Sequence, residues 1–167
     1  MKLAFLFVVV GVPAWATCGT DEQTYLSCKI ENSRKVLSIC LNDDAATYRF
    51  GIDRRPAELS ITEPMATFRY VPWNGLGRSI WEVVEFYNGA YTYEIEAGFD
   101  RMFDDQAELD FPLFGSVRVT RDEQTVVTLE CDRTTVDYNW DTLIWEAKRR
   151  LGLEWDDQAI DWVAKSD

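Results

Sequence analysis

The side chains of this chain that could perform chemistry are carboxylates and cysteines, because histidine is absent. Its 167 residues include 29 acidic and 17 basic side chains, for a net charge of −12. The absence of histidine removes the commonest general base and the commonest metal ligand, and it excludes a Ser-His-Asp or Cys-His site. The catalytic arrangement that the composition still permits is a pair of carboxyl groups, as in glycoside hydrolysis.

Many of the carboxylates lie on, or just after, one predicted β-hairpin. They are Glu82, Glu85, Glu94, Glu96, Asp100, Asp104, Asp105, Glu108 and Asp110. In a chain this acidic some carboxylates fall close together by chance, and most charged side chains are simply exposed to water. The stretch 100–110 also lacks the central glycine and the alternating ligands of an EF-hand. We therefore predict no catalytic residue, no cofactor and no metal ligand, and we keep a carboxylate-dependent hydrolase acting on envelope glycans as the alternative.

The cysteines become informative once the N-terminus is considered. Lys2 precedes an apolar run over 3–12, and Ala14-Trp15-Ala16 fits the cleavage pattern of a secretory signal peptide. The run is short for a bilayer span, which leaves an N-terminal membrane anchor as the less favoured alternative. We predict a signal peptide over 1–16, a periplasmic or secreted mature chain and no membrane span after cleavage. Loss of Lys2 would change the net charge from −12 to −13.

Four cysteines in an exported chain predict two disulfides. They are Cys18, Cys28, Cys40 and Cys131, and sequence alone allows three pairings. If two strands flank a turn over 31–35 and Asn32 lies opposite Val36, then Cys28 falls opposite Cys40, where a cross-strand bridge is feasible. This geometry favours Cys28–Cys40 and Cys18–Cys131.

Closely spaced short strands divided by turn residues predict one disulfide-braced β domain over 17–138. The strands are expected at 25–30, 36–40, 46–51, 58–62, 67–71, 79–87, 90–96, 115–120 and 125–131. With no helical pattern between them, they indicate an antiparallel sandwich or barrel. Asn88-Gly89 between two β-prone runs predicts a two-residue hairpin with Phe86 opposite Tyr91. Its core face is expected to carry Ile80, Val84, Phe86, Tyr91, Tyr93 and Ala97.

The end of the chain, 139–167, changes to a helical pattern and makes the fold α+β overall. One helical face is formed by Trp140, Leu143, Ile144, Ala147 and Leu151. A second short helix is expected to begin at Asp156, with Trp155 packing on Ile160 across its first turn. The tryptophans of this tail, Trp155 and Trp162 among them, either pack on the β domain or form a docking surface for a partner.

The loop 73–79 is the other candidate for partner binding. Trp73 and Arg78 flank Asn74-Gly75-Leu76-Gly77, and tryptophan and arginine are typical of binding hot spots for proteins or sugars. The structural alternative is that Trp73 covers one end of the core while Arg78 pairs with a nearby acid. Candidate partner-binding residues are thus Trp73, Arg78, Trp155 and Trp162.

A series of short motifs resembles a group of small, exported proteins of Gram-negative bacteria for which no activity is known. The motifs are Leu26-Ser27-Cys28, Leu37-Ser38-Ile39-Cys40, Tyr48-Arg49-Phe50-Gly51, Gly75-Leu76-Gly77-Arg78, Asn88-Gly89, Gly98-Phe99-Asp100-Arg101 and Thr128-Leu129-Glu130-Cys131-Asp132. The resemblance covers about 24–132 and implies a periplasmic β domain. Cys18 and the tryptophan-rich tail depart from the group's pattern.

The charge limits which partners are expected. Phosphate binding needs clustered lysine and arginine, so nucleic acid is excluded. A cationic protein would instead be attracted. The sequence thus predicts a non-enzymatic periplasmic binding protein, an inhibitor-like module for a basic partner.

Overall fold

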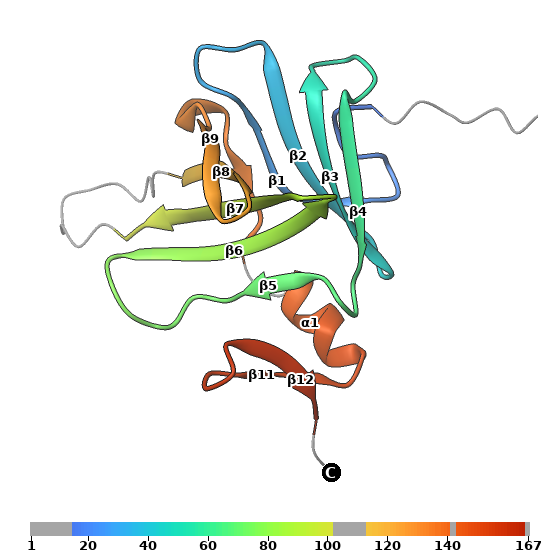
Figure 1. Ribbon diagram of the computed structural model, residues 1–167, viewed down its shortest axis with the longest axis vertical. Helices are drawn as coiled ribbons and strands as arrows, with labels where there is room; N and C mark the ends of the chain where they lie inside the picture. Colours follow the sequence, from blue (N-terminus) through green and yellow to red (C-terminus); the bar gives the residue numbers. More distant parts are fainter. Residues whose placement is uncertain (1–14, 102–112, 141–142, 166–167) are drawn as a thin grey trace, which may run out of the picture.

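The body of the protein consists of two five-stranded antiparallel sheets packed against each other (Figure 1). The structure is a computed structural model that describes residues 15–101, 113–140 and 143–165. The first sheet has the order β10-β1-β2-β3-β4, with β1 (Gln23–Lys29), β2 (Lys35–Leu41), β3 (Ala45–Ile52), β4 (Leu59–Pro64) and β10 (Asp137–Tyr138). The second has the order β5-β6-β7-β8-β9, with β5 (Arg69–Val71), β6 (Ser79–Asn88), β7 (Tyr91–Asp100), β8 (Leu113–Arg121) and β9 (Gln124–Glu130). The predicted fold of mainly antiparallel strands is confirmed, and the described strands close no barrel.

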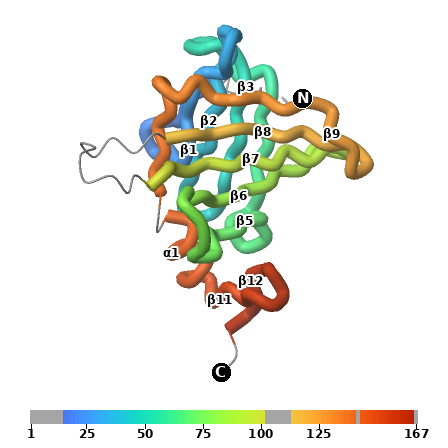
Figure 2. The backbone as a smooth tube through the Cα atoms, turned by 90° about the vertical axis from the view of Figure 1, so that its left-hand side faces the viewer, coloured from blue at the N-terminus to red at the C-terminus, as the bar shows by residue number. Residues whose placement is uncertain are grey.

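The chain builds each sheet as a meander and then returns to its beginning. Strands β1 to β4 pair in sequence order, and β5 to β9 do the same in the second sheet. After β9 a short 3₁₀ helix, η1 (Arg133–Thr135), leads to β10, which pairs with β1 through Leu26 opposite Tyr138. In Figure 2 the second sheet lies across β1–β3, so the core is enclosed between strands from both halves of the chain.

Alternating side chains on β6 and β7 supply much of that core. Ile80, Val84 and Phe86 are buried, as predicted, and Glu82 on the same face is buried too, while Trp81, Val83 and Glu85 on the other face are half-exposed. The turn is shifted by one residue relative to the prediction: Gly89 has a positive φ of 61° at the first turn position, and Phe86 lies opposite Tyr93. The prediction of Phe86 opposite Tyr91 was therefore wrong by two residues. An even shift preserves the faces of a strand, so the predicted core face survives.

One glycine on β7 is required by close backbone contact. A Cβ atom added to Gly98 would lie 2.2 Å from the carbonyl oxygen of Ile80 on β6. A side chain at this position is incompatible with the local approach of the two strands.

All four cysteines form disulfides, as predicted, but the favoured pairing was wrong. The bonds are Cys18–Cys40, which we call the N-terminal disulfide, and Cys28–Cys131, which we call the inter-sheet disulfide. The reason is register: Cys28 lies opposite Leu37 and Cys40 opposite Thr24. Cys131 directly follows β9 and forms a β-bridge with Ile30, which brings it to Cys28.

The tail contains one helix and one β-hairpin. The predicted first helix is present as α1 (Leu143–Arg150), with Ile144 and Ala147 buried, but Trp140 and Leu151 of the predicted face lie outside it and are exposed. The predicted second helix was wrong: β11 (Leu153–Asp156) and β12 (Asp161–Ala164) pair instead, and Trp155 lies opposite Trp162. Asp156 does cap backbone amides, those of Gln158 and Ala159, but these belong to a turn. Ile160 has a positive φ of 52° and is solvent-exposed, so the predicted packing of Trp155 on Ile160 across a helical turn does not occur.

The predicted signal peptide falls mostly outside the described residues, which begin at Trp15. Ala16, at the predicted cleavage position, is buried and donates its N–H to the carbonyl oxygen of Arg55 at 3.1 Å. No helix in the described ranges has the length and apolar character needed to cross a bilayer.

Candidate functional site

The carboxylates singled out on the hairpin separate into one internal group and several surface groups. Glu82 is 4% exposed and points into the core from β6. On the surface, Glu94 pairs with Arg118, and Glu85 accepts a hydrogen bond from Tyr87. Asp104, Asp105, Glu108 and Asp110 lie outside the described residues. The internal carboxylate is therefore the distinctive one.

Three tyrosine hydroxyls donate to the carboxylate of Glu82. Tyr138 donates to Oε2 at 2.6 Å and Tyr25 to the same atom at 3.1 Å, while Tyr70 donates to Oε1. Tyr25 and Tyr138 belong to the first sheet, and Tyr70 and Glu82 to the second. Since a buried charge is tolerated when it is hydrogen-bonded, the cluster satisfies Glu82 and joins the two sheets.

The environment of the cluster keeps the hydroxyl groups of Tyr25 and Tyr138 protonated. Burial, and then the negative charge of Glu82, raises the pKa of Tyr25 well above its ordinary value. The same two causes, in the same order, raise the pKa of Tyr138. Both side chains therefore stay hydrogen-bond donors at every physiological pH.

A small pocket lined by aromatic rings opens above this cluster. Its volume is about 120 Å³, and its lining residues are Tyr70, Pro72, Trp73, Glu82, Trp140 and Trp145. Trp140 is 43% exposed and packs edge-on against Phe99, while Trp73 and Trp145 are half-buried. We call this the aromatic pocket. It combines tryptophan surface with an internal carboxylate.

The loop between β5 and β6 fixes Trp73 at the edge of the aromatic pocket. The indole Nε1 of Trp73 donates to the carbonyl oxygen of Leu76 at 2.8 Å, and the guanidinium of Arg101 lies 4.9 Å from the centre of the Trp73 ring. Gly75 and Gly77 adopt positive φ values of 82° and 92°, which allow the tight turn. Arg78 lies at the other end of the loop, where its Nε donates to the carbonyl oxygen of Arg101.

The tail hairpin packs on the back of the same region. The Trp162 ring stacks on Tyr70 with centroids 5.9 Å apart, and its Nε1 donates to the carbonyl oxygen of Tyr70 at 2.9 Å. Trp155 packs edge-on against Trp162 and is held by a hydrogen bond to Asp157. The tail is thus packed on β5. Of the four candidate partner-binding residues, Trp73 and Trp162 meet around Tyr70, Trp155 lies behind Trp162, and Arg78 lies apart.

A buried lysine supports this packing from α1. Lys148 is 1% exposed, and its Nζ donates to the carbonyl oxygen of Met65 at 3.1 Å and lies 5.7 Å from the centre of the Trp162 ring. Burial lowers the pKa of Lys148 to about 8, against the opposing influence of Asp161. The amine is enclosed by the protein, so its role is structural.

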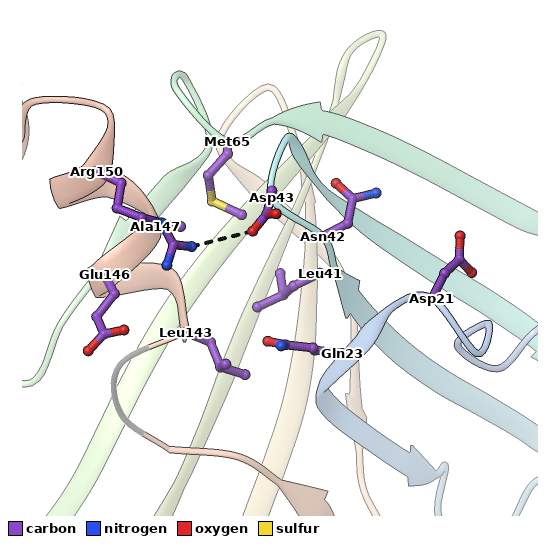
Figure 3. A pocket seen from close by; sticks show the side chains of 10 residues that line it. All are labelled: Asp21, Gln23, Leu41, Asn42, Asp43, Met65, Leu143, Glu146, Ala147 and Arg150. Atoms are coloured by element: carbon purple, nitrogen blue, oxygen red, sulfur yellow. Dashed lines mark hydrogen bonds and ion pairs between the residues drawn. The ribbon is translucent and has the colours of Figure 1, made fainter.

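A larger, polar hollow lies on the other side of α1 (Figure 3). It measures about 300 Å³ and is lined by Asp21, Gln23, Leu41, Asn42, Asp43, Met65, Leu143, Glu146, Ala147 and Arg150. Arg150 on α1 forms an ion pair with Asp43 in the β2–β3 turn, with 3.4 Å between Nη2 of Arg150 and Oδ1 of Asp43. The side chains that line it are mixed in charge, and they do not converge on a common point.

A third hollow, of about 280 Å³, contains Glu31, Glu96, Ser116 and Glu130 at the junction of the two sheets. Burial, followed by the negative charge of Glu94, raises the pKa of Glu96. Glu96 is exposed, and a carboxyl group with a raised pKa in a hollow that also contains a second acid is one feature that a carboxylate-dependent hydrolase would need. Across the described ranges, no group of three or more histidine, cysteine, aspartate or glutamate residues is arranged to hold a metal ion.

The sequence reasoning missed the tyrosine–glutamate cluster. Strand alternation places Glu82 on the same face as Ile80, Val84 and Phe86, and that was the available signal. A glutamate on a core face requires partners, but the sequence does not indicate which tyrosines supply them.

In comparisons with known proteins, the chain matches no family model, no curated protein and no solved structure. The resemblance to small exported proteins of Gram-negative bacteria therefore stays a prediction.

Proposed function

We propose that this is a non-enzymatic binding protein that engages a basic protein partner outside the cytoplasm. The observation that carries the proposal is the aromatic pocket, in which half-exposed tryptophans surround an internal carboxylate. Tryptophan is enriched among the residues that dominate binding energy. A net charge of −12 adds long-range attraction for a cationic protein and speeds its association.

Two features support an extracytoplasmic location. One disulfide joins the segment before β1 to β2, the other joins β1 to the residue after β9, and such bonds persist in oxidising compartments. The N-terminal sequence fits a signal peptide, and its removal would leave the mature chain still more acidic. Periplasmic or secreted localisation belongs to the proposal.

The test is a pull-down from periplasmic extract with folded, disulfide-bonded protein as bait, at low and at moderate salt. We expect the bait to retain a basic protein at low salt, and we expect moderate salt to weaken this binding because salt screens the attraction. A bait carrying Trp73→Ala and Trp140→Ala should lose the partner, whereas Trp81→Ala, on the outer face of β6, should keep it. Folded wild-type bait that retains no protein at either salt would contradict the proposal.

A carboxylate-dependent hydrolase is the second candidate, and the raised pKa of Glu96 favours it. It requires turnover of an envelope glycan that falls sharply in both Glu96→Gln and Glu130→Gln. An enzyme assay across cell-wall substrates separates the two proposals, since a binding protein gives no product.

A further inference from the structure

The aromatic pocket has the size of one side chain rather than of a whole metabolite. Its volume is about 120 Å³, whereas pockets for small molecules usually measure roughly 300–1,000 Å³. A sugar ring with its hydroxyl groups needs more room and several polar partners. The occupant is therefore a compact group at the end of a chain, or a very small molecule.

The rings that line the pocket favour a cation. Tyr70, Trp73, Trp140 and Trp145 contribute aromatic surface, and the faces of such rings attract ammonium and guanidinium groups. The protein already uses this attraction twice nearby: Arg101 lies over Trp73 and Lys148 over Trp162. Trp140 is the most exposed of the pocket tryptophans, so it is the ring most accessible to an incoming group.

The carboxylate of Glu82 gives the pocket its charge preference. Glu82 lines the pocket and is fixed in place by hydroxyl groups from three strands, so it cannot turn away to solvent. Such a fixed negative charge among aromatic rings suits an alkylammonium group, whose methylene or methyl groups contact the rings. It disfavours carboxylates and phosphates, which would face a like charge in the pocket.

We infer that the aromatic pocket binds an alkylammonium group. The inference rests on the proposed function in one respect: the alkylammonium group is supplied by a lysine side chain of the basic partner. A free small alkylammonium compound has the same chemistry and would occupy the same pocket. The pocket would thus be the point where the acidic protein recognises a particular residue, beyond its general attraction for positive charge.

The test measures binding of n-butylammonium and choline to the full-length folded protein at constant ionic strength. The neutral isostere of choline, 3,3-dimethyl-1-butanol, is the matched probe without charge. Chemical shifts of the tryptophan indole N–H groups report where each probe binds. We expect saturable shifts at Trp140 and Trp145 with both cations and at least several-fold weaker binding of the neutral alcohol.

Two variants locate the site. Trp140→Ala should weaken binding of the cations about 3- to 30-fold, as loss of one cation–π contact does. Trp81→Ala removes a half-exposed tryptophan outside the pocket and should leave their affinity unchanged. Because Trp140 is partly exposed, its replacement should preserve the fold, and unchanged dispersion of the remaining indole signals checks this.

Each result decides the inference. Equal binding of the neutral alcohol, absence of shifts at the pocket tryptophans, or equal effects of the two variants would overturn it. If a basic partner is captured but n-butylammonium neither binds nor competes, the inference fails and the proposed function stands. If the cations bind in the pocket while no protein partner is captured, the pocket serves a free alkylammonium compound and the proposed protein partner is wrong.

Discussion

Removing the hydroxyl of Tyr138 tests whether the glutamate cluster joins the two sheets. Tyr138→Phe deletes the hydrogen bond of 2.6 Å to Oε2 of Glu82 but keeps the ring, which packs edge-on against Tyr25 with centroids 5.4 Å apart. Two donors, Tyr25 and Tyr70, remain on the carboxylate. The substitution therefore isolates one hydrogen bond from packing.

The expected loss in the free energy of unfolding is about 2 kcal/mol, because hydrogen bonds to charged groups contribute roughly 1.5–3 kcal/mol. For a chain of this size, about 2 kcal/mol lowers Tm by roughly 4–8 °C. The matched control is Tyr48→Phe. Tyr48 is also buried, but no hydrogen bond of its hydroxyl occurs within the part of the chain that the structure describes, so its loss should cost well under about 1 kcal/mol.

Urea unfolding at pH 7, followed by tryptophan fluorescence with the disulfides intact, measures both variants. Alkaline pH adds a second signature, since burial and then the charge of Glu82 raise the pKa of Tyr138 in the folded protein. Its stabilising contribution is complete below the unfolded-state pKa near 10 and is lost as the pH rises above it. Tyr138→Phe should thus reduce the fall in stability above pH 10 by about 1.4 kcal/mol per pH unit. The role assigned to the cluster would be refuted if Tyr138→Phe and Tyr48→Phe destabilised the protein equally and if the stability of Tyr138→Phe fell above pH 10 as steeply as that of the wild type.

Three further predictions address other parts of the fold. Burial lowers the pKa of Lys148 to about 8, against 10.5 in the unfolded chain, so between pH 8 and 10 the unfolded chain holds the extra proton and the free energy of unfolding rises with pH. Lys148→Met should abolish that rise in urea titrations, and an unchanged pH dependence would contradict the prediction. The cysteines of the inter-sheet disulfide are 103 residues apart, and replacing both by alanine should lower the free energy of unfolding by about 5 kcal/mol. The same change at the N-terminal disulfide, with a separation of 22, should lower it by about 3 kcal/mol. The reverse order of urea midpoints would argue against loop entropy as the cause. In Gly98→Ala the new Cβ would lie 2.2 Å from the carbonyl oxygen of Ile80 on β6, so the free energy of unfolding should fall by at least about 3 kcal/mol. An unchanged melting temperature would show that the two strands separate easily.

Local patterns predicted which faces are buried better than they predicted which residues meet. On β6 and β7 the alternation of side chains identified Ile80, Val84 and Phe86 as core residues, although the turn lies one residue further along. A turn error of one residue moves the pairing by two, and the period of a strand is also two. The predicted face was therefore insensitive to the error.

The disulfide pairing was sensitive to the same kind of error. On β1 and β2 the expected pairing put Cys28 opposite Cys40, but Cys28 lies three residues away, opposite Leu37. An odd shift changes both the partner and the face. The true partner, Cys131, comes from the second sheet, and no pattern near Cys28 indicates it.

The tail and the cluster show two other limits. Asp156 has the sequence signature of a helix cap, and a turn that needs the same amide hydrogen bonds uses it equally well. For Glu82, alternation could have indicated the buried position but was not used for it, whereas the tyrosines converge on it from β1, β5 and β10. Such convergence depends on the packing of distant strands and is not encoded in any local stretch.

Because β1 pairs with β10, the first sheet can be completed only late in the synthesis of the chain. During synthesis β1 emerges first and leaves the edge that faces β10 open, and an open strand edge is a template for aggregation. Only when Tyr138 has been made can that edge be covered and the third hydroxyl reach Glu82. High contact order of this kind slows folding. The first sheet can thus be completed only after its last strand has been made, and until then the open edge of β1 is the part of the sandwich that a chaperone would need to cover.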